Sequence, residues 1–283
     1  MQKISAIVLA MTILLLTGCA AARPERTGGI AATTAPVAEL TGALLDGTDV
    51  FVELLITEPV SCLHDYTLSV EQMKLAENSS LIVISGMGLE EFMEDVLRDC
   101  TVIDASAGIA PLPGEEGDDP HIWLDPANLR SMTKTVSAEL QKAYPDKAAA
   151  IAANEKTYCE KLDELTAYGK EQLAALSCRK LVTFHDGFSY FAKAFGLEIA
   201  AAMEVEPGSE PSAKELEAVI ATVIDNGIPA VFTEVNGTTD AAELVGREAG
   251  VKAYPLNMAM SLRNETYFDV MKKNIDTIKD VLG

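Results

Sequence analysis

Short apolar runs alternate with longer amphipathic stretches from about residue 29 to residue 105. In the longer stretches, apolar residues recur at helical spacing, whereas the short runs have the length and composition of buried strands. This alternation of strands and helices predicts a mainly parallel sheet with helices on both faces. The predicted strands are 29–33, 50–57, 81–85 and 101–105, and the predicted helices are 37–45, 70–76 and 89–97.

A long helical segment follows this first group of elements. Residues 111–119 are rich in turn formers and acids and predict a loop, and residues 126–144 predict a helix that stops at Pro145. Residues 146–176 contain no proline and one glycine, and their apolar positions are typical of a single helix of roughly 45 Å. A helix of this length is suited to joining two lobes. The apolar residues that define it are Ile151, Tyr158, Leu162, Leu165 and Leu176.

The alternation then restarts in the segments 180–185, 188–195, 197–203, 229–234 and 251–256, with helices expected at 212–226 and 239–249. Ser212 and Glu215 predict a capping box, and Gly227 predicts the stop of the same helix. The predicted fold is therefore α/β, with two lobes that each hold a mainly parallel sheet flanked by helices, joined by one long rigid helix. The expected division is 1–18 signal, 19–29 tether, 30–145 first lobe, 146–176 linking helix and 177–283 second lobe.

The N-terminus has the pattern of an export signal. Lys3 precedes an apolar run over residues 4–16, which is too short to span a bilayer. The following Leu16-Thr17-Gly18-Cys19 resembles a bacterial lipobox, which implies cleavage before Cys19 and lipidation of its thiol. We therefore expect a protein anchored through Cys19 at the cell surface or the periplasmic face of the membrane; an ordinary signal peptide with an incidental cysteine is the alternative.

Charge and cysteine content limit the expected partners and crosslinks. The net charge of −21 argues against nucleic acid as a partner. Apart from Cys19, the chain has Cys62, Cys100, Cys159 and Cys178, an even number that permits disulfides in an exported protein. If Cys159 and Cys178 lie on one helix they are roughly 28 Å apart, too far to bond, so Cys62 with Cys100 is the favoured pair.

Candidate chemistry centres on the only three histidines, His64, His121 and His185, which all fall at expected strand ends or loops beside a carboxylate. In open parallel sheets, ligands bind beyond the carboxyl ends of the strands. Neutral imidazole is the commonest ligand for ions such as zinc, so these positions predict one metal site between the lobes. Asp65 and Asp186 could orient the rings, and solvated acids or helix caps are an equal alternative for them.

Four phrases of the sequence carry a resemblance to a known family. They are Leu63-His64-Asp65-Tyr66, Asp119-Pro120-His121-Ile122-Trp123-Leu124-Asp125-Pro126, Phe184-His185-Asp186-Gly187-Phe188-Ser189-Tyr190-Phe191 and Glu210-Pro211-Ser212-Ala213. They resemble phrases of the metal-binding lipoproteins that deliver zinc or manganese to ABC importers, and the likeness extends from about residue 29 to residue 262. The resemblance implies the two-lobed fold with a rigid linking helix, a permease as the partner, and His64, His121 and His185 as the first three ligands. We also expect a monomer.

The fourth ligand is the point at which this sequence departs from the family, which usually has Asp or Glu where Asn257 stands. A neutral amide oxygen is a weaker ligand than a carboxylate, so the fourth position is expected to be Asn257, water or Glu234. For Glu234, a hydrogen-bonding role in the cleft is the simpler interpretation. Three imidazoles favour Zn²⁺ as the cargo, with Mn²⁺ as the alternative.

Two other functions fit parts of this pattern. A three-histidine site with an open position is also typical of zinc hydrolases and hydratases, but the sequence shows no recognisable proton-transfer pair, so we expect no enzyme. An adhesive surface lipoprotein is compatible with the same fold and anchor. The segment 108–119 is short and acidic, without the histidines with which zinc members of the family gather metal.

Overall fold

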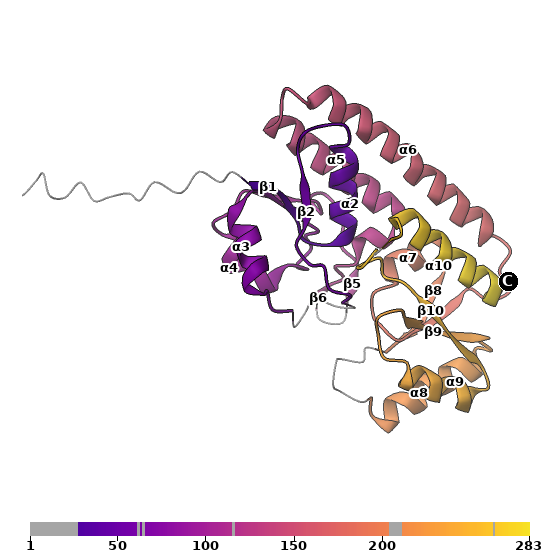
Figure 1. Ribbon diagram of the computed structural model, residues 1–283. Helices are drawn as coiled ribbons and strands as arrows, with labels where there is room; N and C mark the ends of the chain where they lie inside the picture. Colours follow the sequence, from indigo (N-terminus) through magenta and orange to yellow (C-terminus); the bar gives the residue numbers. More distant parts are fainter. Residues whose placement is uncertain (1–27, 61–62, 64–65, 115–116, 204–210, 263) are drawn as a thin grey trace, which may run out of the picture.

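The structure is a computed structural model that describes residues 28–283 apart from 61–62, 64–65, 115–116, 204–210 and 263. It contains two four-stranded sheets, with strand orders β2-β1-β3-β4 and β10-β9-β7-β8. Every strand pairing within these two sheets is parallel. The sheets lie in separate halves, and helices cover them (Figure 1). The predicted α/β fold with two parallel sheets is confirmed.

In the first sheet, both faces are buried because successive side chains enter different apolar clusters. Ile30 and Ala32 point into the main core, whereas Ala31 packs with Ile82 in a smaller cluster on the opposite face. The strands are β1 (Gly28–Ala32), β2 (Val52–Leu54), β3 (Ser79–Ile84) and β4 (Val102–Asp104), and the helical segments are α2 (Ala35–Leu44), α3 (Val70–Asn78), η1 (Glu91–Met93) and α4 (Glu94–Leu97).

In the sequence between the strands of the first sheet and those of the second, the chain forms a small hairpin and two long helices. The predicted loop at 111–119 contains a two-residue antiparallel pair, β5 (Pro113–Gly114) with β6 (Gly117–Asp118), and a 3-10 turn follows as η2 (Ile122–Leu124). Helix α5 (Pro126–Ala143) begins where the carboxylate of Asp125 accepts a hydrogen bond from the backbone N–H of Ala127.

The long helix is α6 (Ala148–Gln172), whose 25 residues span about 37 Å. The predicted helix is confirmed but shorter, and Leu176 lies beyond its end. The predicted stripe through Ile151, Leu162 and Leu165 is buried. Helix α6 contacts α2, α5 and α10. A Cβ on Gly169 would lie only 2.2 Å from the ring of Phe195, so the absence of a side chain lets helix α7 approach α6 closely.

The second sheet repeats the buried pattern of the first. Ala230 and Phe232 face the main core, and Val231 faces a second cluster with Val182 and Val223. The predicted capping box of Ser212 and Glu215 is confirmed. The strands are β7 (Lys180–Thr183), β8 (Glu198–Ala202), β9 (Ala230–Glu234) and β10 (Lys252–Leu256), and the helices are α7 (Ser189–Phe195), α8 (Ala213–Asp225) and α9 (Asp240–Ala249).

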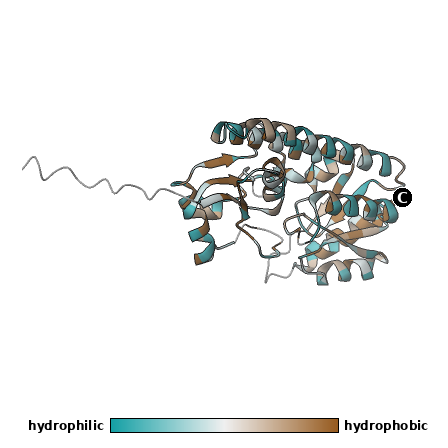
Figure 2. Cartoon of the chain, turned by 45° about the horizontal axis from the view of Figure 1, so that its top comes forward, coloured by the Kyte–Doolittle hydropathy of each residue, from teal (hydrophilic) through white to brown (hydrophobic). Residues whose placement is uncertain are grey.

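The last helix, α10 (Tyr267–Leu282), was not predicted. It begins with a capping box formed by Thr266 and Asp269 and contacts α6 and β10 (Figure 1). The main apolar core runs through both sheets, from Ile30 in the first to Phe232 in the second. Hydrophobic residues accordingly concentrate on the strands of both halves, and hydrophilic residues recur along the helices (Figure 2). The division at residues 145–146 and 176–177 stays a prediction.

Two sequence expectations concern crosslinks and membrane contact. Cys100, Cys159 and Cys178 are free thiols, and Cys62, the favoured partner of Cys100, lies outside the described residues. The Sγ of Cys100 lies 3.2 Å from the carbonyl oxygen of Val96.

Within the described residues, no helix combines the length and hydrophobicity needed to cross a membrane. The signal and Cys19 fall in the undescribed first 27 residues.

Candidate metal site

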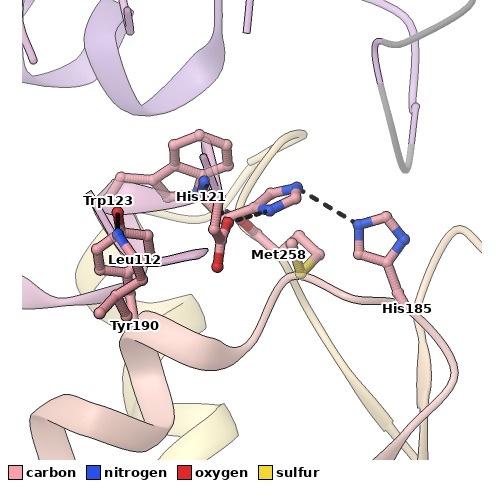
Figure 3. A network of polar contacts seen from close by, with 7 residues as sticks. Leu112, His121, Trp123, His185, Tyr190 and Met258 are labelled. Carbon is pink, nitrogen blue, oxygen red and sulfur yellow. Dashed lines mark hydrogen bonds and ion pairs between the residues drawn. The ribbon is translucent and has the colours of Figure 1, made fainter. Parts of the chain in front are cut away.

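The two described histidines converge from different halves of the fold. His121 directly precedes η2, and His185 lies two residues beyond the carboxyl end of β7. Both side chains are buried, at 4% and 7% exposure. Their Nε2 atoms lie 3.4 Å apart, and the rings meet edge to face with centroids 5.2 Å apart (Figure 3).

This separation matches what a shared ion requires. Two imidazole nitrogens that each bind zinc at 2.0–2.1 Å in a tetrahedral site lie about 3.3 Å from each other. The pair in the structure, at 3.4 Å, therefore needs almost no rearrangement to bind one ion through both Nε2 atoms.

The ring of His121 is held by Asp119, a residue that the sequence analysis did not assign to the site. Oδ1 of Asp119 accepts from Nδ1 of His121 at 2.8 Å and from the His121 backbone N–H at 2.9 Å. Because an ionised carboxylate only accepts hydrogen bonds, this contact keeps the proton on Nδ1 and leaves the lone pair on Nε2 for a metal. The signal was present in the phrase Asp119-Pro120-His121.

The segment that carries Asp119 is itself fixed from the second half. The backbone N–H of Asp119 donates to the carbonyl of Leu112 at 2.8 Å, and the backbone N–H of Leu112 donates to the hydroxyl oxygen of Tyr190 at 2.9 Å. Tyr190 is on α7, shortly after His185 (Figure 3). Burial raises the pKa of Tyr190, so its hydroxyl stays protonated and neutral.

Trp123 connects the His121 segment to the loop after β10. Its Nε1 donates to the carbonyl of Met258 at 2.7 Å, and its own carbonyl accepts from the hydroxyl of Tyr267 at 2.7 Å. Burial raises the pKa of Tyr267 well above its ordinary value, so this hydroxyl remains a donor. The backbone N–H of Tyr267 donates in turn to Glu39 on α2. This chain of contacts fixes the two halves around the site.

The predicted ligand His64 lies outside the described residues, but its neighbours are described. Leu63 is buried at 1% exposure, and the hydroxyl of Tyr66 donates to Glu58 at 2.7 Å. The amide Nε2 of Gln72 contacts both Glu58 and the Tyr66 hydroxyl. These contacts join Tyr66 to Glu58 and to Gln72 on α3.

The predicted fourth-ligand residues lie at the carboxyl edge of the second sheet. Glu234 ends β9, paired in register with Leu256, and is 3% exposed. Asn257 is the first residue after β10. Its side-chain oxygen accepts a hydrogen bond from the backbone N–H of Ala259 at 2.8 Å, which engages that oxygen in a local turn. Across the described residues, no group of three His, Cys, Asp or Glu side chains is close enough to hold a metal.

Comparison with known proteins gives the family. The profile of ZnuA, the periplasmic component A of the zinc-uptake complex, matches residues 30–281. The chain belongs to this family. That assignment agrees with the parallel sheets and with the long helix that the structure shows.

Similar proteins include a zinc-binding and an iron-binding protein. The zinc-binding lipoprotein AdcA of Streptococcus pneumoniae is 30% identical over 99% of this chain and 61% of its own length. The iron-binding protein YfeA of Yersinia pestis is 29% identical over 83% of this chain and 80% of its own. The crystal structure of the Zn(II)-bound ZnuA-like domain of S. pneumoniae AdcA has a TM-score of 0.79 at 30% identity, covering 90% of this chain and 98% of that one.

The chain thus spans about three fifths of the length of the curated AdcA relative. It covers nearly all of the ZnuA-like domain of that protein, however. The similarity concerns that domain.

Proposed function

We propose that this protein captures Zn²⁺ between its two halves and delivers the ion to an ABC-type importer. The observation that carries the proposal is the 3.4 Å separation of the Nε2 atoms of His121 and His185, with Asp119 fixing the first ring. Membership of the zinc-uptake family and the Zn(II)-bound state of the similar AdcA domain support zinc as the cargo. Mn²⁺ is the alternative, and the similar YfeA is an iron-binding protein.

In the proposed site, His121 and His185 bind through Nε2, and His64 is the third ligand. Neutral nitrogen donors suit zinc better than manganese, which draws on more oxygen ligands. Because the side-chain oxygen of Asn257 is engaged by Ala259, we assign that residue to the loop after β10 and leave the fourth position to water or Glu234. Binding without catalysis is the proposed mode, so zinc-loaded protein should not turn over esters or bicarbonate.

The location and partner follow from the same proposal. Lipidation of Cys19 would hold the protein on the outer face of the membrane, beside the permease that receives the ion. Residues 19–29 would form the tether. One chain supplies both described ligands, so the proposed site needs no second copy, and we propose a monomer as the functional unit.

Zinc affinity of histidine variants tests the proposal. Stoichiometry is measured by elemental analysis and affinity by competition with a zinc chelator. We expect one zinc per chain, and a loss of at least 100-fold in affinity for His64→Ala, His121→Ala and His185→Ala. Glu234→Gln and Asn257→Ala compare the two candidate residues for the fourth position, and a loss confined to Glu234→Gln would assign that ligand. Retention of wild-type affinity by either His121→Ala or His185→Ala would refute the site.

A further inference from the structure

Met258 adds a donor of different chemistry to the two histidines. It lies in the loop after β10 and is completely buried. Figure 3 shows its side chain, with the sulfur, beside the rings of His121 and His185. Neither the family match nor the proposed zinc site gives this residue a role.

Distances from Gly187 define where the Met258 side chain lies relative to both imidazole rings. A Cβ placed on Gly187 would be 2.3 Å from Cε of Met258, 2.8 Å from Cδ2 of His185 and 3.1 Å from Cε1 of His121. These two ring carbons are the ones bonded to the Nε2 atoms that face each other. The terminal methyl of Met258 and the metal-binding halves of both imidazoles therefore surround one small space.

The position of Met258 is fixed at its backbone and adjustable at its side chain. Its carbonyl accepts the 2.7 Å hydrogen bond from Trp123, and the adjacent Ala259 has a left-handed φ of 61°. The side chain has three rotatable bonds and a polarisable sulfur, so small rotations can bring the sulfur toward the gap between the rings without moving the loop.

We propose that Met258 is a specificity-determining residue whose thioether, together with His121 and His185, lets the site bind a soft monovalent ion such as Cu(I). Thioether sulfur is a soft ligand that favours Cu(I), whereas hard ions such as Mn²⁺ prefer oxygen ligands. The inference rests on the proposed function in that it uses the same two histidines. It adds a second class of cargo and assigns the selectivity to one side chain.

Paired methionine variants test this inference. Met258→Leu removes the sulfur with nearly constant volume, and Met260→Leu is the matched control, since Met260 is also buried in the main core two residues later. Cu(I) affinity is measured by competition with bicinchoninate under anaerobic reducing conditions, after alkylation of the thiols, because cysteine sulfur also binds Cu(I). Folding is checked by circular dichroism, and zinc affinity is measured for each protein.

We expect Met258→Leu to lose at least tenfold in Cu(I) affinity and less than that in zinc affinity, with Met260→Leu within about twofold of the wild type for both ions. X-ray absorption at the copper edge should show a sulfur neighbour in the wild type that is absent from Met258→Leu. Equal Cu(I) affinity in wild type and Met258→Leu, or copper without a sulfur neighbour in the wild type, would overturn the inference. The zinc measurements separate the two proposals, because a failure to bind zinc would leave a Met258-dependent Cu(I) affinity intact.

Discussion

The indole Nε1 of Trp123 donates a 2.7 Å hydrogen bond to the backbone carbonyl of Met258, a residue 135 positions further along the chain. Trp123 lies two residues after His121, and Met258 lies beside the rings of both histidines. One buried contact therefore ties the segment that carries His121 to the loop that closes the other side of the site. Since both residues are essentially inaccessible to solvent, water cannot replace this hydrogen bond.

Replacing Trp123 by Phe should destabilise the protein substantially. The carbonyl of Met258 would remain buried without its donor, which costs about 1–3 kcal/mol, and the smaller ring would leave a cavity. We expect the free energy of unfolding, measured by urea denaturation followed by circular dichroism, to fall by about 2 kcal/mol or more. A decrease below about 0.5 kcal/mol would show that the contact contributes little.

Trp123 should also report on metal binding, because it is the only tryptophan and its ring lies 5.4 Å from that of His121. Binding of an ion to Nε2 changes the charge beside the indole. We expect tryptophan emission to change in proportion to zinc bound and to saturate at one equivalent. Unchanged emission in protein shown by elemental analysis to be loaded would contradict the proposed position of the ion.

Asp119→Asn should weaken zinc binding while Asp118→Asn should not. The amide at position 119 can no longer provide the same charged acceptor for Nδ1 of His121, and loss of such a partner typically costs 10–100-fold in metal affinity. Asp118 is the neighbouring acid in the same hairpin but is exposed. The measurement is chelator competition on both variants. Similar zinc affinities for the two would argue that Asp119 does not prepare the ligand.

Gly187→Ala should disturb the site more than the fold. The new methyl would fall 2.3 Å from the Met258 side chain and 2.8 Å from His185, so both must shift. We expect zinc affinity to fall at least tenfold, with a modest loss of stability. Gly42→Ala in α2 is the control, because its methyl would meet nothing within 4 Å and the helix should gain up to about 1 kcal/mol. Wild-type affinity in Gly187→Ala would show that the space beside the rings is larger than the structure indicates.

Glu90 should make stability depend on pH. Its buried carboxyl, near the carboxyl ends of β1 and β3, accepts from the Thr33 hydroxyl at 2.6 Å and from the backbone N–H of Ser85 at 2.7 Å. Burial raises the pKa of Glu90 to about 7 from its ordinary value of 4.5.

The folded state therefore binds more protons than the unfolded state between these two values, and stability contributed by Glu90 falls as pH rises from about 4.5 through 7. The whole effect is on the order of 3 kcal/mol. We expect the stability of the wild type relative to Glu90→Gln to improve on acidification from pH 8 to pH 5, as measured by denaturation at each pH. A difference that is constant with pH would contradict the raised pKa.

The sequence predicted the parallel sheets well because apolar residues recur with different periods in buried strands and in amphipathic helices. Helix start signals such as the Ser212 capping box could also be predicted, because they are formed by residues close together in the sequence. Helix α10 was missed although its signal was present: Thr266 and Asp269 form a capping box, and Val270, Ile275 and Ile278 are buried on one face. The prediction stopped at the last strand instead of following this pattern to the end.

The site was harder to predict because its details depend on three-dimensional contacts. The sequence identified His121 and His185 from their positions at strand ends, and the structure brings them together. Asp65 and Asp186 stay predictions as acids that orient the rings. The carboxylate in contact with His121 is Asp119, and that contact depends on the turn through Pro120. The approach of Met258 to the rings depends on packing between residues more than 70 positions apart.

The apolar core that runs through both sheets limits how an ion can enter and leave. If the two halves moved apart as rigid bodies, buried side chains such as Trp123 and Tyr267 would be exposed to water, and the hydrogen bond between these two residues would break. Exchange with solvent is therefore expected to proceed through rotation of ligand side chains and movement of the segments at the strand ends, while the scaffold behind them stays assembled.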